Sequence, residues 1–190
     1  TVDFTQSGNT FSIPAEATTA SITVTILDDA IFEGDETITL TLDTASGATI
    51  GVPAARTVTI LDDEPTPTVT FATASSFASE GAGTATIALT LSGESASAVS
   101  VPVALSGSAT LTTDYSAAPI PVIFLAGQTS ATVTITIVSD AVNEIDETVV
   151  LDLGSPTGAG LGAIATHTFT ISDNDGVPTV EFDVPTASLD

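Results

Sequence analysis

Hydrophobic and polar residues alternate with a period of two in several segments of the chain. In residues 131–137, whose sequence is ATVTITI, Val133, Ile135 and Ile137 fall on one side and threonines on the other. Such alternation is typical of a β-strand that buries one face. The same pattern recurs in residues 20–26, 84–91, 99–105, 148–153 and 165–171. We predict a strand in each of these segments.

Clusters of Gly, Pro, Asp and Ser separate the alternating segments, and no sustained helical pattern of hydrophobic residues is present. β-Branched residues dominate the segments, as is usual in sheets. We therefore predict an all-β chain. Its antiparallel strands are expected to form sandwiches of two sheets, with about seven strands per repeat.

A repeat with an offset of 111 residues organises the chain. Asp3 recurs as Asp114, and Asp62 recurs as Asp173. Recurrence at a constant offset is the mark of a repeat array. Prolines at 65, 67 and 178 follow the last acidic cluster of each copy, so we place the domain boundaries there.

The repeat predicts three parts. Residues 1–67, called the first unit, form the later part of a repeat without its first strands. Residues 68–178, called the second unit, form a complete repeat. Residues 179–190 are expected to be the first strand of a third unit, because Val180 stands where the second unit has Val69.

The charge balance narrows the choice of partners. The chain has 24 acidic residues and one basic residue, for a net charge of −23. This excess disfavours nucleic acid and anionic membrane surfaces. The longest apolar stretch, residues 117–127, is short and contains two prolines, so we expect no direct membrane insertion. With 43% hydrophobic residues, the chain is also unlike a disordered acidic tail.

The acids recur at fixed positions near predicted strand ends, which indicates a cation site, because gathered carboxylates repel one another without a counter-ion. Cysteine is absent, and oxygen ligands at flexible spacing suit calcium better than magnesium. The candidates in the second unit are Asp114, Asp140, Glu144, Glu147, Asp173 and Asp175, and those in the first unit are Asp3, Asp28, Asp29, Glu33, Glu36, Asp62, Asp63 and Glu64.

The alternative is that these acids serve only solubility and protect strand edges. Asp35 and Asp146 are weaker candidates, because they adjoin stronger ones and could face solvent. Arg56 and His167 occupy the same repeat position. We favour the interpretation that they are surface neighbours of the acids over the alternative that His167 is a metal ligand.

Four motifs of the second unit resemble the Calx-beta family. They are TDY at residues 113–115, GQT at 127–129, SDAVNEIDE at 139–147 and DND at 173–175. The first unit has the counterparts VDF at 2–4, DDAIFEGDE at 28–36 and DDE at 62–64. The resemblance covers nearly the whole chain.

This resemblance implies an immunoglobulin-like sandwich that binds Ca²⁺ through its distal loops. It adds Glu80 and Asn174 to the expected ligands of the second unit. The two units differ, because Ser139 and Asn174 stand where the first unit has Asp28 and Asp63. The second unit therefore has fewer charges at these two positions, and this chain contains no counterpart of Glu80 for the first unit.

Catalysis is not expected. The chain has one histidine, no cysteine and no lysine, so no Ser-His-Asp set can form in both units. Paired carboxylates could serve a glycosidase, but such clefts are usually rich in aromatic residues, and this chain has no tryptophan and one tyrosine.

We expect a structural module: calcium-stiffened sandwiches in a secreted or cell-surface adhesin, filament or surface-layer protein. The alternative is a calcium-sensing regulatory domain of a membrane transporter or receptor. Recognition of a carbohydrate or receptor would reside in other domains. The expected partners are calcium ions and either neighbouring repeats or head-to-tail copies of the chain, with covalent continuation favoured over strand donation by residues 179–190.

Overall fold

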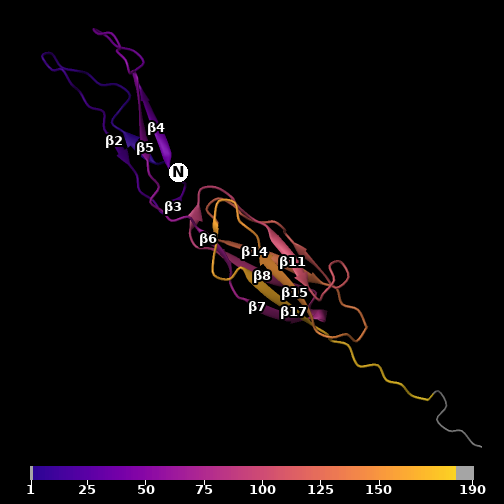
Figure 1. The fold of residues 1–190 in the computed structure, drawn as a ribbon. Coiled ribbons are helices and arrows are strands. Elements are labelled where there is room, and N and C mark those ends of the chain that lie inside the picture. Colours follow the sequence, from indigo (N-terminus) through magenta and orange to yellow (C-terminus); the bar gives the residue numbers. More distant parts are fainter. Residues whose placement is uncertain (1, 183–190) are drawn as a thin grey trace, which may run out of the picture.

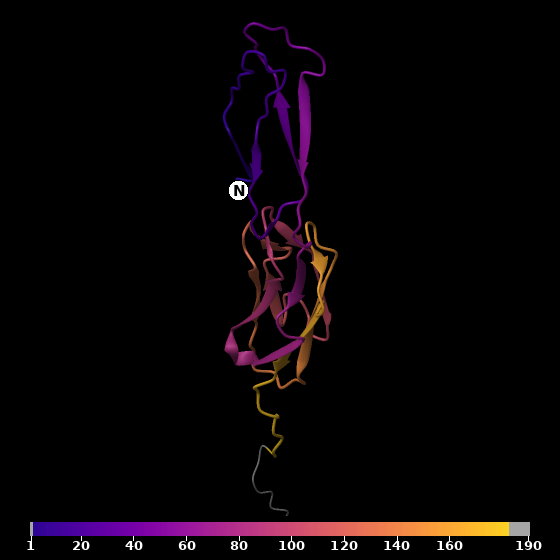
Figure 2. The ribbon, with the colours of Figure 1, turned by 90° about the vertical axis from the view of Figure 1, so that its left-hand side faces the viewer.

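A computed structural model of the protein describes residues 2–182. The first and second units lie end to end along a common long axis, as two views at right angles show (Figures 1 and 2). The described residues contain no helix with the length and apolarity needed to cross a membrane.

The second unit is a sandwich of two main sheets. One sheet has the order β12-β14-β8-β6-β16 and the other β11-β15-β17-β7. Its strands are β6 (Thr68–Phe71), β7 (Ser75–Ser79), β8 (Thr84–Leu91), β9 (Glu94–Ser95), β10 (Val99–Val101), β11 (Val103–Gly107), β12 (Tyr115–Ala118), β13 (Val122–Phe124), β14 (Ser130–Ile137), β15 (Glu147–Leu153), β16 (Gly160–Leu161) and β17 (Thr166–Ser172), with a 3₁₀ turn η1 at Glu80–Ala82. The predicted all-β sandwich is confirmed.

Alternation along the strands builds the core of the second unit. On β14, Val133 and Ile135 are fully buried between the sheets, while the threonines beside them face outward. Val149 and Leu151 of β15 and Phe169 of β17 meet them from the opposite sheet. Each such side chain contributes roughly 1.5–3 kcal/mol on burial. The fold of this unit therefore rests on a core that contains none of the acidic candidates.

Two details differ from the sequence prediction. Residues 99–105 form two strands instead of one, because Pro102 lacks an N–H and the chain changes partners there: β10 pairs with β13 and β11 pairs with β15. In addition, two of the pairings, β7 with β17 and β6 with β16, are parallel.

His167 is a core residue, so the expectation that it is a surface neighbour of the acids was wrong. Its side chain is 2% exposed. Its Nδ1 lies 2.7 Å from the Thr73 carbonyl oxygen and therefore carries the proton, which leaves Nε2 to accept from the Ser76 hydroxyl at 2.8 Å. With both ring nitrogens engaged away from the acids, His167 is not a cation ligand here.

The first unit contains five strands in residues 2–67. They are β1 (Phe4–Gln6), β2 (Val24–Ile26), β3 (Ile31–Phe32), β4 (Glu36–Thr41) and β5 (Ala55–Ile60). β1 pairs with β2 and β4 with β5, both antiparallel. Within residues 2–64, Ile38 is the one hydrophobic side chain that is buried. The predicted strand at residues 20–26 is formed over its last three residues.

Residues 179–182 form no strand, and Val180 and Phe182 are almost fully exposed. Residues 183–190 lie outside the described part of the chain. The expected first strand of a third unit therefore stays a prediction.

Candidate cation sites at the ends of the two units

Antiparallel pairing gathers the acids of the first unit at one end, called its acidic pole. Asp3 immediately precedes β1 and Asp28 follows β2, and Phe4 of β1 is paired with Ile26 of β2. Glu36 begins β4 opposite Ile60 near the end of β5. Acids from distant segments therefore converge because each lies at a strand end on the same side of the unit.

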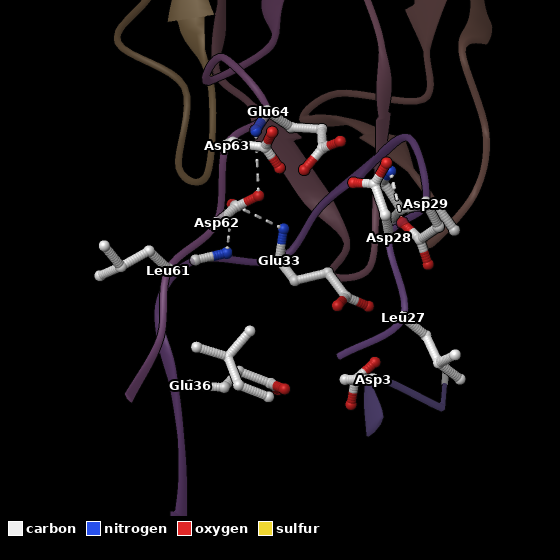
Figure 3. A pocket seen from close by; sticks show the side chains of 13 residues that line it. Asp3, Leu27, Asp28, Asp29, Glu33, Glu36, Leu61, Asp62, Asp63 and Glu64 are labelled. Atoms are coloured by element: carbon white, nitrogen blue, oxygen red, sulfur yellow. Dashed lines mark hydrogen bonds between the residues drawn. The ribbon is translucent and has the colours of Figure 1, made fainter. Parts of the chain in front are cut away.

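These acids form two groups of carboxylates. Oxygens of Asp3, Glu33 and Glu36 lie within 4.8 Å of one another, and so do oxygens of Asp28, Asp63 and Glu64. Figure 3 shows these side chains around one pocket at the acidic pole. Asp29 and Asp62 also line this pocket. The structure thus brings together all eight of the candidates predicted in the first unit.

The acidic pole of the second unit repeats this arrangement. Tyr115, which follows Asp114, pairs with Ile137, and Glu147 pairs with Ile171. One pocket is lined by six of its predicted ligands: Glu80, Asp114, Asp140, Glu144, Glu147 and Asp173. This pole faces away from the first unit (Figures 1 and 2).

Glu80 takes part in a group that includes Asp140 and Asp175, whose oxygens lie within 4.8 Å of one another. Glu80 is only 7% exposed, and its Oε1 accepts a hydrogen bond of 2.9 Å from the Asp140 main-chain N–H. Asn174 is exposed and its amide lies beside Gly81. The second unit has Ser139 and Asn174 where the first unit has Asp28 and Asp63. Glu80 thus adds a carboxylate to a pole that has lost two others.

The carboxylates perturb one another. The negative charge of Asp3, and then a hydrogen bond with it, raises the pKa of Glu36. Partial burial, followed by the charge of Asp114, raises the pKa of Glu147. Each shift means that the ionised form is disfavoured where it stands, and a bound cation would relieve that cost.

The residues present fit a hard divalent cation. All donors at both poles are oxygens, the ligand type that calcium prefers. Asp175 Oδ2 is buried and has no hydrogen-bond partner among residues 2–182. A buried carboxylate oxygen without a partner is costly, so a ligand for it is expected.

Hydrogen bonds that sequence reasoning missed connect the loops at each pole. Asp62 Oδ2 accepts from the main-chain N–H groups of Glu33 at 3.1 Å and Gly34 at 2.6 Å. The N–H of Gly34 is the main reason why the pKa of Asp62 is lowered. In return, Asp35 Oδ1 accepts from the Asp62 N–H at 3.1 Å. Asp35, a weaker candidate in the sequence, therefore bonds to the candidate ligand Asp62.

The second unit repeats the bonds of Glu33 and Asp35 and adds two from Asn143. Asp173 Oδ2 accepts from Glu144 N–H at 3.1 Å, and Asp146 Oδ1 accepts from Asp173 N–H at 3.1 Å. The Asn143 side-chain amide donates to Asp173 Oδ2 at 2.9 Å and to the Asp175 carbonyl oxygen at 3.1 Å. The recurrence of Asp146 at the offset of Asp35 was the available sequence signal, but the bond itself required the folded geometry.

Comparison with known proteins agrees with this geometry. The family model of the Calx-beta domain matches residues 1–64 and 62–175. No curated protein matches the chain. The chain is similar to the solved structure of the apo form of the Calx CBD1 domain, with 23% identity, a TM-score of 0.53, and coverage of 58% of this chain and 100% of that one.

Two tandem structures are also similar. The calcium binding domain CBD12 of CALX1.1 has 24% identity and a TM-score of 0.51, with 56% of this chain and 46% of that chain covered. CBD12 from CALX1.2 has 20% identity and a TM-score of 0.51, with 80% and 73% covered. At these identities the likeness shows a shared fold.

Proposed function

The chain belongs to the Calx-beta family, and on that premise we propose that it is a calcium-binding structural module whose ions stiffen the connection between successive units. One observation carries the proposal. The loop that holds the cation candidates of the first unit also pairs with the second unit, through β3 and β9.

The contact between the units is a short parallel pairing. Ile31 is opposite Glu94 and Phe32 is opposite Ser95, and the Ala96 N–H donates to the Phe32 carbonyl oxygen at 3.0 Å. Ser95 is buried and its own carbonyl accepts from Gly127 N–H, so β9 is anchored in the second unit.

Candidate ligands flank this contact on both sides along the chain. Asp28 and Asp29 precede β3, and Glu33 follows it. Asp63 and Glu64 come immediately before the linker prolines and share a carboxylate group with Asp28. An ion bound there would tie the linker to the loop that touches the second unit, leaving few residues free to bend.

Neutralising the first-unit site tests this proposal. The double variant Asp28→Asn with Asp63→Asn removes two carboxylates beside the contact. The control, Asp140→Asn with Asp175→Asn, removes two carboxylates from the pole that faces away from it. In small-angle X-ray scattering with saturating CaCl₂, the first variant should become flexible and the control should stay as extended as the wild type.

The proposal fails if both variants scatter alike. It also fails if the wild type binds no calcium in isothermal titration calorimetry, or if its scattering is the same in CaCl₂ and in excess EGTA.

We assign this module to a secreted or cell-surface adhesin, filament or surface-layer protein, where external calcium in the millimolar range would fill even weak sites. The second candidate is a calcium sensor, because a ligand loop that touches the next unit could also transmit occupancy. Affinity separates them: a sensor needs dissociation constants near micromolar calcium, whereas a structural module functions with weaker ones.

The proposed partners beyond calcium are neighbouring Calx-beta units, in one chain or in head-to-tail copies. The exposed Val180 and Phe182 support this, since their counterparts Val69 and Phe71 are buried core residues of the second unit. The proposal retains the three parts 1–67, 68–178 and 179–190, and it assigns no catalytic role.

A further inference from the structure

We propose that Asp35 and Asp146 are positioning residues of the cation sites. Each holds the ligand loop of its unit, residues 28–35 or 139–146, against the end of the last strand before an ion binds. This inference rests on the proposed function, because it concerns how the same sites are organised. It gives a role to two acids that neither line the pockets nor belong to the carboxylate groups found among residues 2–182.

The geometry is reciprocal in the first unit. Asp35 lies in the ligand loop and accepts from the Asp62 N–H, while the Asp62 carboxylate accepts from the N–H groups of Glu33 and Gly34 in that loop. Two segments 27 to 29 residues apart are thereby joined in both directions. We call this pair of contacts the aspartate brace.

The second unit has this brace at the same offset, with a single N–H of the loop, that of Glu144, bonded to Asp173. Asp146 accepts from Asp173 N–H at 3.1 Å, and Asp173 accepts from Glu144 N–H at 3.1 Å. The two units differ elsewhere in their acids and in their number of strands, yet both bonds are retained. This repetition indicates that the brace belongs to the ligand arrangement itself.

The brace also determines which atoms remain available to an ion. Asp173 uses Oδ2 to accept from the loop and Oδ1 to accept from Asp175 N–H at 3.1 Å. That turn orients Asp175, whose Oδ2 has no hydrogen-bond partner in the part of the chain that the structure describes. Removing a residue that hydrogen-bonds to a metal ligand and orients it typically lowers metal affinity about 10- to 100-fold.

The test distinguishes two roles of the Asp146 side chain, as a hydrogen-bond acceptor and as a negative charge. Asp146→Asn keeps an acceptor oxygen but loses the charge, whereas Asp146→Ala loses both. Both are made in the full chain that carries Asp3→Asn, Asp28→Asn, Glu36→Gln and Asp63→Asn, which removes carboxylates from both groups of the first unit, so that the second unit dominates calcium binding. Calorimetry with CaCl₂ should show affinity reduced about tenfold by Ala and changed less than about threefold by Asn. Thr132→Ala, on the outward face of β14, is the control and should bind as the parent does.

A second measurement does not depend on calcium. In excess EGTA, hydrogen exchange at the Asp173 amide should accelerate in Asp146→Ala and stay slow in Asp146→Asn. Equal loss of affinity in Asn and Ala would overturn the proposal, because charge or direct ligation would then be the role of Asp146. Unchanged affinity in Ala, or unchanged exchange, would overturn it as well. A wild-type chain that binds no calcium would refute the proposed function, while the exchange measurement would still decide whether the brace exists.

Discussion

Removing calcium from the second unit should lower its melting temperature while both sheets stay folded. The reason is the separation of core and site. Val69, Leu89, Ile135 and Leu151 are fully buried between the sheets. The acids lie in loops, in the 3₁₀ turn η1 or at the first residue of a strand, so their mutual repulsion acts on the loops first.

The size of the effect follows from the carboxylate group at this pole. Oxygens of Glu80, Asp140 and Asp175 lie within 4.8 Å of one another, and Glu80 and Asp140 line the same pocket as Asp114, Glu144 and Glu147. One ion bound there, at a free concentration 100 times its dissociation constant, contributes about 2.7 kcal/mol. At about 4 °C per kcal/mol for a domain of this length, chelation should lower the melting temperature by about 10 °C.

Differential scanning calorimetry in excess EGTA and in saturating CaCl₂ would measure this shift. Asp140→Asn with Asp175→Asn should lower the melting temperature in CaCl₂ and reduce the shift caused by EGTA. Hydrogen exchange should show the loops at 140–146 and 173–175 losing protection before β14 and β15. An identical melting temperature in the two buffers would refute the reasoning.

Three further predictions concern protons, backbone and loop order. In EGTA, acidification from pH 7 toward pH 5 should raise the melting temperature, because the folded-state pKa values of Glu36, Glu64 and Glu147 lie above the ordinary 4.5 and folding then takes up protons. In saturating CaCl₂ the same acidification should lower the melting temperature, since protons compete with the ion. A change of the melting temperature in the same direction in both buffers would contradict these pKa shifts. Gly107→Ala should destabilise the second unit by more than about 2 kcal/mol in urea unfolding. The reason is that Gly107 has φ 121° and that a Cβ there would collide with the Thr148 carbonyl oxygen. The control Gly93→Ala adds its Cβ in open space and should change the free energy of unfolding little. Asn143→Ala should weaken calcium binding by the second unit about tenfold in calorimetry, because Asp173 loses an N–H donor. An unchanged affinity would show that the Asn143 hydrogen bonds do not contribute to calcium binding.

Much of the fold could be predicted from the sequence because strand formation is signalled locally. The alternation in residues 84–91 corresponds to β8 over its whole length, and that in residues 131–137 to β14 within one residue. The offset of 111 residues identified the acids that recur, and strand ends on one side of a sandwich bring such acids together. Family, architecture and the main carboxylates were therefore accessible without coordinates.

Pairing partners were not accessible in this way, because they depend on contacts between distant segments. Pro102 is visible in the sequence, but only the folded chain shows that β10 and β11 pair with different strands there. The sequence predicts His167 to be a surface neighbour of the acids because it is a lone cation on a strand near them, whereas the second unit buries it against Ser76 and Phe71. Its environment is built by β6 and β7, about 90 residues earlier in the chain.

The contacts between site and neighbour were likewise decided by tertiary structure. The sequence shows Ile31 and Phe32 as two apolar residues inside an acidic loop, and nothing local indicates that they pair with Glu94 and Ser95. Asp146 reads as a solvated charge, because a one-dimensional pattern records which residues are acidic but not which N–H each carboxylate meets. Spacing along the chain determined what gathers at each pole, and the three-dimensional approach of separate loops determined which of those groups face an ion and which hold the others in place.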